Sequence, residues 1–391
     1  MMRRVVLDLR AFDDREQLHA YLQEKLGLPA YYGRNLDALY DCLTDTWEET
    51  GIILHLPERM GNYTPALQEV FEDACRVNSN LHMLEEENMK LANDKNAAFP
   101  RLCAHRGYNF IAPENTLPAF ALAVSMGAQE IELDLWPSRD GDLIVCHDPK
   151  VDRTTNGTGS ISDLTTKEIR MLDAGEKFSP AFKGTKLPLF EEVLDLFGGK
   201  VIFNIHIKSP VRTKVKAERM SQRSREWSHF YNNRIETFPP LPVGIEEIVP
   251  EYENRPLLPY PEKDFQKILD TLDAFKCREH AYIAGEKDVL HTAREMAPDI
   301  ARCCLEGHMN FTIVDHAIEY GCKKLQFCKN LTTQAMIDKA RKHGLICNLF
   351  WADSAEEAKA YMDIGIDCVL TNNFAAVKAG LEAMGAGSFE R

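Results

Sequence analysis

Residues 101–116, RLCAHRGYNFIAPENT, begin with a short apolar run that ends in a histidine and an arginine. The run has the length of a buried β-strand, and Gly107 permits a sharp bend of the backbone or the close approach of a ligand. A histidine can transfer a proton, and the forked guanidinium of an arginine binds phosphate oxygens. Because the carboxyl ends of parallel strands carry the sites of α/β folds, His105 and Arg106 are candidate site residues, although packing would also explain a lone histidine.

A second strand-like segment, residues 129–136 (QEIELDLW), carries two acidic residues, Glu132 and Asp134. Side chains two positions apart in a strand point to the same face. Two carboxylates on a buried face are costly unless they hold a cation, and Mg²⁺ or Ca²⁺ prefers such oxygen ligands. The segment therefore predicts a metal site, with an exposed edge strand as the alternative.

The dipeptide Asp140-Gly141 is a strong signal for a β-hairpin after this strand. If these two residues form the turn, Arg139 faces Asp142 and His147 lies directly opposite Asp134. The hairpin would then bring a second histidine to the predicted metal carboxylates.

A third segment, residues 200–210 (KVIFNIHIKSP), alternates apolar and polar residues. The alternation places Asn204, His206 and Lys208 on one face of a strand. A polar face on an otherwise apolar strand favours a binding site, and a surface strand is the alternative.

The composition is that of an ordinary globular chain, with 391 residues, 45% hydrophobic residues and a net charge of −14. This negative charge argues against a nucleic-acid-binding protein, and no apolar run approaches the roughly 18 residues of a membrane span. The eleven cysteines are scattered without metal-ligand spacing, which favours buried thiols in a reducing compartment. We therefore expect a cytoplasmic protein.

Residues 1–85 are expected to form a compact α/β unit. We expect strands at 3–9, 51–56 and 80–84, and helices at 14–26, 34–47 and 64–77. Residues 86–99 lack an apolar face and are expected to form a linker. Residues 1–88 hold 8 Lys and Arg against 17 Asp and Glu. Such acidity would speed association with a basic partner, or would simply keep the unit soluble.

Residues 100–391 are expected to form the larger domain, with about nine strand-like segments between residues 101 and 371. Residues 211–235 contain seven Lys and Arg and two Glu, and a proline-rich passage follows them. We expect residues 211–260 to be a basic insertion that leaves from the site end of the domain. It would be either a lid for anionic substrates or a solvated surface segment.

The segment LPAYYGRNLDALYDCLT, residues 28–44, resembles the recognition segment of barstar, the small inhibitor of a secreted basic ribonuclease. The resemblance extends over about residues 3–84 and implies a small three-layer-like α/β fold with a short parallel sheet. It also implies binding of a basic ribonuclease, or of another basic protein, through Tyr31, Gly33, Asp37, Tyr40, Asp41 and Thr44. Asp37 and Asp41 are four residues apart and share one helix face, whereas Tyr40 stands where the inhibitor has tryptophan.

The strings HRG…PENT, EIELD, HD…DRTTNGTG and NIHIK together resemble the glycerophosphodiester phosphodiesterases. The resemblance is strong over about residues 100–210 and weaker over residues 349–373. It implies a (β/α)8 TIM barrel in which His105 and His147 are the acid/base pair. It further implies that Arg106 and Lys208 contact the substrate phosphate, that Glu132 and Asp134 bind a divalent metal, and that Trp351 lines the substrate pocket. The Asp140-Gly141 hairpin would explain a ninth strand beside the eight of a barrel.

One position departs from this family, which usually has glutamate where this chain has His206. A neutral and softer imidazole as third metal ligand would weaken Mg²⁺ or Ca²⁺ and favour Mn²⁺ or Zn²⁺. The resemblance implies metal-dependent hydrolysis of glycerophosphodiesters to glycerol 3-phosphate and an alcohol, a reaction of lipid metabolism. The alternatives are a ribonuclease-inhibitor-like binding protein with an impaired barrel, or a diesterase acting on lysophospholipids.

Overall fold

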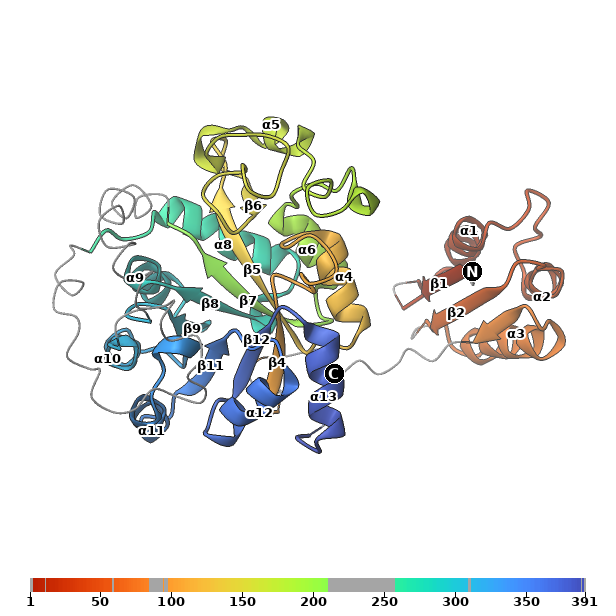
Figure 1. Cartoon of the computed structure of the whole chain (residues 1–391). Coiled ribbons are helices and arrows are strands. Elements are labelled where there is room, and N and C mark those ends of the chain that lie inside the picture. The colour runs from red at the N-terminus through yellow and green to blue at the C-terminus, as the bar shows by residue number, and fades with distance from the viewer. Residues whose placement is uncertain are drawn as a thin grey trace. The chain divides into compact units, whose positions relative to one another are not determined.

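The computed structural model describes residues 3–10, 12–57, 60–83, 94, 98–209, 257–308, 311–387 and 389. The chain divides into two units, Met1–Met89 and Lys90–Arg391, and each has its own hydrophobic core (Figure 1). Nearly all of the expected linker and of the expected basic insertion lies outside the described residues. Each unit is therefore considered by itself.

The first unit is a three-stranded parallel sheet packed against helices. The sheet has the order β1 (Arg3–Asp8), β2 (Thr50–His55) and β3 (Leu81–Met83). The helices are α1 (Arg15–Leu26), α2 (Leu36–Thr44) and α3 (Tyr63–Val77). Helix α2 begins later than predicted because the Asn35 side chain accepts a hydrogen bond from the backbone N–H of Ala38 and so caps the helix, and it ends at Thr44, three residues earlier than predicted.

The second unit is a closed barrel of eight parallel strands, which confirms the predicted TIM-barrel fold (Figure 1). The strands are β4 (Arg101–His105), β5 (Glu130–Pro137), β7 (Ile202–Ile207), β8 (Ala281–Gly285), β9 (Ala301–Cys304), β10 (Lys324–Cys328), β11 (Ile346–Phe350) and β12 (Cys368–Thr371). Their order is β4-β12-β11-β10-β9-β8-β7-β5, and β4 also pairs with β5, which closes the ring.

Helices follow the strands and cover the outside of the barrel (Figure 1). They are α4 (Leu117–Ser125), α6 (Phe190–Phe197), α8 (Glu262–Ala274), α9 (Lys287–Met296), α10 (Ile313–Glu319), α11 (Gln334–Lys342), α12 (Ala355–Asp363) and α13 (Phe374–Ala383). A further helix, α5 (Thr166–Met171), packs with β6 (Leu143–Val145) in a separate small core. Short 3₁₀ turns lie at Ile161–Asp163, Pro180–Phe182, Arg278–His280 and Lys329–Leu331. The main apolar core lies between these helices and the outward faces of the strands.

The ninth strand, β6 (Leu143–Val145), pairs antiparallel with β5 as the predicted hairpin requires, but the predicted register was wrong by one residue. Trp136 pairs with Ile144, and the backbone N–H of Cys146, not of His147, reaches the carbonyl of Asp134. The loop has three residues, closed by a 2.8 Å hydrogen bond from the Ser138 N–H to the Asp142 carbonyl. Gly141, at φ +86°, supplies the extra left-handed residue, so the turn is longer than a two-residue turn.

The amino-terminal end of the barrel is closed by buried ion pairs. Arg101 Nη1 lies 3.0 Å from Asp94 Oδ1 and 3.4 Å from Glu130 Oε2, and Lys324 Nζ lies 2.7 Å from the same Asp94 oxygen. Tyr282 donates a hydrogen bond to Glu130. Removing one member of such a cluster leaves a charge unpaired, so this end of the barrel serves stability, and the opposite end is left for a site.

Candidate active site

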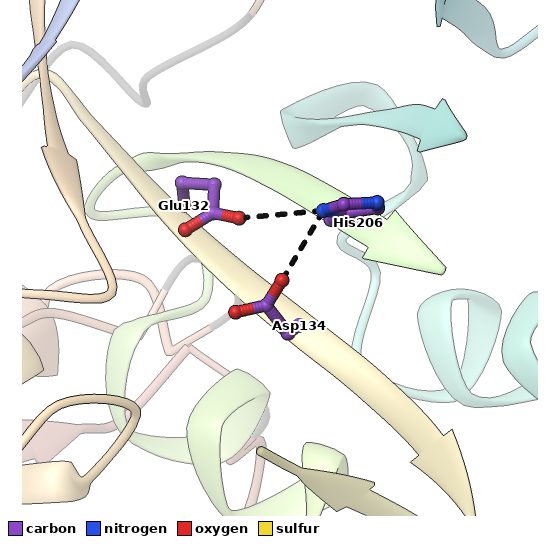
Figure 2. A group of neighbouring side chains, drawn as sticks. All are labelled: Glu132, Asp134 and His206. Atoms are coloured by element: carbon purple, nitrogen blue, oxygen red, sulfur yellow. Dashed lines mark ion pairs between the residues drawn. The ribbon is translucent and has the colours of Figure 1, made fainter. Parts of the chain in front are cut away.

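The two predicted metal carboxylates meet His206 because β5 and β7 pair in parallel. The register places Glu132 beside Asn204 and Asp134 beside His206. His206 Nδ1 lies 3.2 Å from Asp134 Oδ1 and 3.9 Å from Glu132 Oε1 (Figure 2). One ligand atom from each of the three residues lies within 4.8 Å of the others. Glu132 and Asp134 are almost completely buried, so the structure brings the three predicted ligands together.

The electrostatics of this group fit a divalent cation. Burial, and then the charge of Asp134, raises the pKa of Glu132 well above its usual range. Although burial opposes it, the Lys208 ammonium holds the pKa of Asp134 well below its usual range. Asp134 Oδ1 is buried and lies 2.9 Å from Lys208 Nζ, with which it forms an ion pair. Among the described residues, none donates a well-directed hydrogen bond to this oxygen. Two carboxylates and an imidazole are a donor set that a cation would satisfy.

The imidazole of His105, at the end of β4, is held in one orientation by a chain of hydrogen bonds. Asn372 Nδ2 donates to Asp353 Oδ2 at 2.9 Å, so Asn372 presents its Oδ1 atom to the histidine. His105 Nδ1 lies 2.8 Å from that oxygen and therefore carries the proton. Nε2 is left without a proton, and burial, followed by the charge of Arg106, lowers the pKa of His105 to about 3.

Arg106 connects to the second histidine through a network of ion pairs. Its Nη1 atom lies 3.0 Å from Glu114 Oε1, and Arg153 contacts both oxygens of Glu114 at 2.7 and 2.8 Å. Arg153 also contacts Asp148 at 2.7 Å, and Asp148 Oδ1 accepts a 2.7 Å hydrogen bond from His147 Nδ1. The Arg153 guanidinium thus supports both a phosphate-binding candidate and a proton-transfer candidate.

The turn after β4 is strained, and tight packing holds it. Arg106 has φ +57° and Gly107 has φ +79°, a region that side chains other than glycine rarely adopt. A Cβ atom on Gly107 would lie 2.6 Å from the backbone carbon of Ala119, so the close approach predicted for this glycine is made by α4. Asn115, at φ +55°, donates a 2.8 Å hydrogen bond to Asp134 Oδ2.

All eight site residues predicted for the barrel line one cavity of about 660 Å³ at the carboxyl ends of the strands. They are His105, Arg106, Glu132, Asp134, His147, His206, Lys208 and Trp351. The ring of Trp351 stacks on that of His105, with centroids 6.1 Å apart and planes 9° apart. His147 reaches the cavity from beyond the end of β6, although the register predicted for the hairpin was wrong.

Sequence reasoning missed the residues that hold these side chains in place. They are Glu114, Asn115, Asp148, Arg153, Asp353 and Asn372. Glu114 and Asn115 belong to the PENT string, and Asp148 and Arg153 to the HD…DRTTNGTG string, so their motifs were visible. Their partners were not, because most of these contacts join segments that are separated in the sequence.

In the first unit, the predicted acidic face lies on α2. Asp37 and Asp41 are both exposed, and Tyr31 in the loop before the helix is 86% exposed. Tyr40 is partly buried against the core of the unit, and the Thr44 hydroxyl donates within the helix, 3.0 Å from the Tyr40 carbonyl. Gly33 is exposed just before the Asn35 cap.

Each of the two units matches a different family of known proteins. The model of the glycerophosphoryl diester phosphodiesterase family matches residues 105–249. A glycerophosphodiester phosphodiesterase of Bacillus subtilis is 30% identical over 283 residues, covering 69% of this chain and 82% of that protein. The chain belongs to the glycerophosphoryl diester phosphodiesterase family. In this member of the family the barrel follows a barstar-like domain, because the model described as barstar (barnase inhibitor) matches residues 2–91.

One further relative aligns over a shorter region, and a solved structure shares the fold. A glycerophosphodiester phosphodiesterase of Caldanaerobacter subterraneus is 50% identical over 109 residues, which are 28% of this chain and 45% of that protein. The chain therefore spans about half the length of this relative. A phosphodiesterase of Oleispira antarctica, solved in complex with the product sn-glycerol-3-phosphate, shares the fold, with a TM-score of 0.56 at 19% identity. That alignment covers 73% of this chain and 97% of the solved chain.

Proposed function

We propose that this protein hydrolyses glycerophosphodiesters to glycerol 3-phosphate and an alcohol in a reaction that requires a divalent metal ion. One observation carries the proposal: two histidines, two cationic side chains and a three-residue metal-type donor set line a single cavity. Membership of the phosphodiesterase family supports the same reaction.

The two histidines differ in their Nδ1 partners, and this difference supports different roles. His105 donates to a neutral amide and keeps Nε2 unprotonated, so it is the proposed acceptor of the proton from the attacking hydroxyl. His147 donates to the carboxylate of Asp148, which stabilises positive charge on the ring. His147 is therefore the proposed donor of a proton to the oxygen of the leaving alcohol.

The cationic residues would bind the phosphate. Arg106 is the proposed clamp on the phosphoryl oxygens, and Lys208 would contact them from β7. Glu132, Asp134 and His206 would hold the metal ion, which when bound supplies positive charge near the phosphoryl oxygens. Because His206 replaces a carboxylate with a neutral imidazole, Mn²⁺ or Zn²⁺ is proposed to support activity better than Mg²⁺ or Ca²⁺.

Hydrolysis of glycerophosphocholine by the full-length protein tests this proposal. The assay is run with Mg²⁺, Ca²⁺, Mn²⁺ and Zn²⁺ in turn, on the wild type and on His105→Ala. Metal-dependent release of glycerol 3-phosphate that His105→Ala abolishes would support it. If no metal gives such activity, the alternative of a binding protein with an impaired barrel is favoured. Parallel assays with a lysophospholipid test the third alternative.

We also propose that the barstar-like domain binds a basic protein, with a ribonuclease as the first candidate. The exposed carboxylates of Asp37 and Asp41, four residues apart on α2, support this role. Salt-sensitive binding to a basic ribonuclease that Asp41→Ala weakens is the expected result. Unaltered ribonuclease activity at micromolar concentrations of this protein would argue for another partner.

The remaining predictions concern organisation and location. We propose a barstar-like domain of residues 1–85, a linker of residues 86–99 and a barrel domain of residues 100–391. All eleven cysteines lie in the described part of the chain and none of them forms a disulfide there, which supports the proposed cytoplasmic location. Among the described helices, none has both the length and the apolar character needed to cross a membrane.

A further inference from the structure

We propose that the amino-terminal end of the barrel holds a second binding site, in which Arg302 takes a small oxyanion, a phosphate or a carboxylate. The site is a cavity of about 210 Å³ that shares no lining residue with the active-site cavity. Its lining includes Ala281 and Ala301, where β8 and β9 begin, and Lys323, just before β10. The inference does not depend on the proposed phosphodiesterase function, because the active site lies at the other ends of these strands.

The guanidinium of Arg302 is only partly satisfied by the protein. Arg302 points outward from β9, because it lies two residues before Cys304, which packs in the core between the strands and the helices. Its Nη2 atom donates a 2.9 Å hydrogen bond to the Gly321 carbonyl, just beyond the end of α10. Its Nε and Nη1 atoms are buried, and no described residue accepts a hydrogen bond from either. Buried N–H groups of a charged side chain require acceptors, so the cavity is expected to receive one.

The carboxylates at this cavity are engaged by other groups. Asp94 Oδ1 lies 2.7 Å from the ammonium of Lys324, in the ion-pair cluster that closes this end of the barrel. Asp299 Oδ2 lies 2.7 Å from Arg278 Nε. Glu279, the third carboxylate of the lining, has an interaction of its own. Within the described part of the chain, these three residues therefore do not supply the acceptors that the guanidinium lacks.

The charge and the size of the cavity define the class of ligand. Lys323 is exposed and lines the same cavity, and its backbone N–H donates a 3.0 Å hydrogen bond to the Arg302 carbonyl, so the two cations are held on neighbouring segments. Hydrogen bonds from a guanidinium are strongest to anionic oxygens, and an ammonium nearby adds to the attraction. A cavity of about 150 Å³ can admit benzene, so this cavity of about 210 Å³ has room for a phosphate or a short carboxylate.

Calorimetric titration of the full-length protein without metal tests the site, with inorganic phosphate and with succinate as the two probes. Lys208→Gln is the background, because it removes a proposed phosphate contact of the active site. Saturable binding of at least one probe is expected, and the probe that binds more tightly identifies phosphate or carboxylate as the ligand. Adding Arg302→Gln should weaken this binding about tenfold, as expected for the loss of charge-assisted hydrogen bonds. Arg294→Gln, at an exposed arginine that pairs with Glu295 in α9, is the matched control and should leave binding unchanged.

Two results would overturn the inference: no binding of either probe to the background variant, or binding that Arg302→Gln leaves unchanged. Urea unfolding shows whether Arg302→Gln is folded, since the hydrogen bond to Gly321 is lost with it. If that variant does not fold, amide hydrogen exchange of the background variant decides. Exchange that the bound probe slows in residues 298–303 and 321–323 supports the second site, whereas slowing confined to residues 105–107 and 206–208 places the probe in the active site and refutes it.

Discussion

Replacing Arg153 with lysine should reduce activity far more than it reduces stability. Arg153 contacts Glu114 and Asp148 through four hydrogen bonds of 2.7 to 3.2 Å, and these carboxylates support Arg106 and His147. Lysine keeps the charge, but its single nitrogen cannot hold two carboxylates in fixed geometry. Both Arg106 and His147 would then lose support at the same time.

The magnitude follows from the exposure of the network. The Arg153 side chain is 48% exposed, so solvent screening limits its ion pairs to about 1 kcal/mol of folding stability. Displacement of catalytic groups by about 1 Å can reduce the rate up to about 100-fold. We therefore expect kcat/KM to fall about 10- to 100-fold, which corresponds to about 1.4 to 2.7 kcal/mol of transition-state stabilisation.

The assay is metal-supported hydrolysis of a glycerophosphodiester, with urea unfolding measured on the same preparations. Arg139→Lys is the matched control, because Arg139 forms an exposed ion pair with Glu168 at 3.5 Å in the same hairpin region and does not line the cavity. The double variant Arg153→Lys with Glu114→Gln should lose less than the sum of the two single losses. Wild-type activity of Arg153→Lys, or an equal loss in Arg139→Lys, would refute the reasoning.

Three further predictions concern the metal site, the turn after β4 and the response to acid. His206→Glu should shift the preference of activity from Mn²⁺ or Zn²⁺ toward Mg²⁺ or Ca²⁺, and an unchanged metal order would contradict the proposed ligand role. Gly107→Ala should lower the free energy of unfolding in urea by about 2 to 4 kcal/mol, because alanine is strained at this positive φ and its Cβ atom would clash with Ala119. Gly184→Ala is the control: it has φ +92° but open space around the Cβ position, so it should lower the free energy of unfolding by only about 1 kcal/mol. The pKa of His105 is lowered to about 3 in the folded state, so this histidine is protonated at a lower pH in the folded protein than in the unfolded chain. The free energy of unfolding therefore falls as the pH drops from 6.5 toward 3. At pH 5 the buried, unprotonated His105 should lower the free energy of unfolding by about 2 kcal/mol. In urea unfolding without metal, His105→Gln should therefore lose less stability between pH 6.5 and 5 than the wild type does. An equal loss in the two proteins would contradict the lowered pKa of His105.

The sequence was sufficient for features that depend on local order along the chain. The two-residue spacing of Glu132 and Asp134 placed both on one face of a strand, and the alternation around His206 did the same on another. The structure brings these residues together because both strands belong to one parallel sheet, as the alternating strand and helix patterns indicated. Local periodicity sets the direction of side chains, so it can be read without knowledge of distant contacts.

The hairpin marks the limit of such reasoning. Asp140-Gly141 correctly predicted the turn, but the same dipeptide fits a two-residue turn and a three-residue loop with a left-handed glycine. The choice between them changes the register by one residue, and the contacts of Ser138 and Asp142 with Thr166 accompany the longer loop. Those contacts come from a segment more than twenty residues away.

The sequence by itself determined the barrel, the barstar-like domain and the side chains that gather at the carboxyl ends of the strands. Only the tertiary structure decided how these side chains are held. His105 is oriented by Asn372, 267 residues away, because β12 pairs with β4 when the barrel closes. Arg153 joins Glu114 to Asp148 because two loops meet above neighbouring strands. Such contacts depend on strand order and ring closure, which no local pattern of residues encodes.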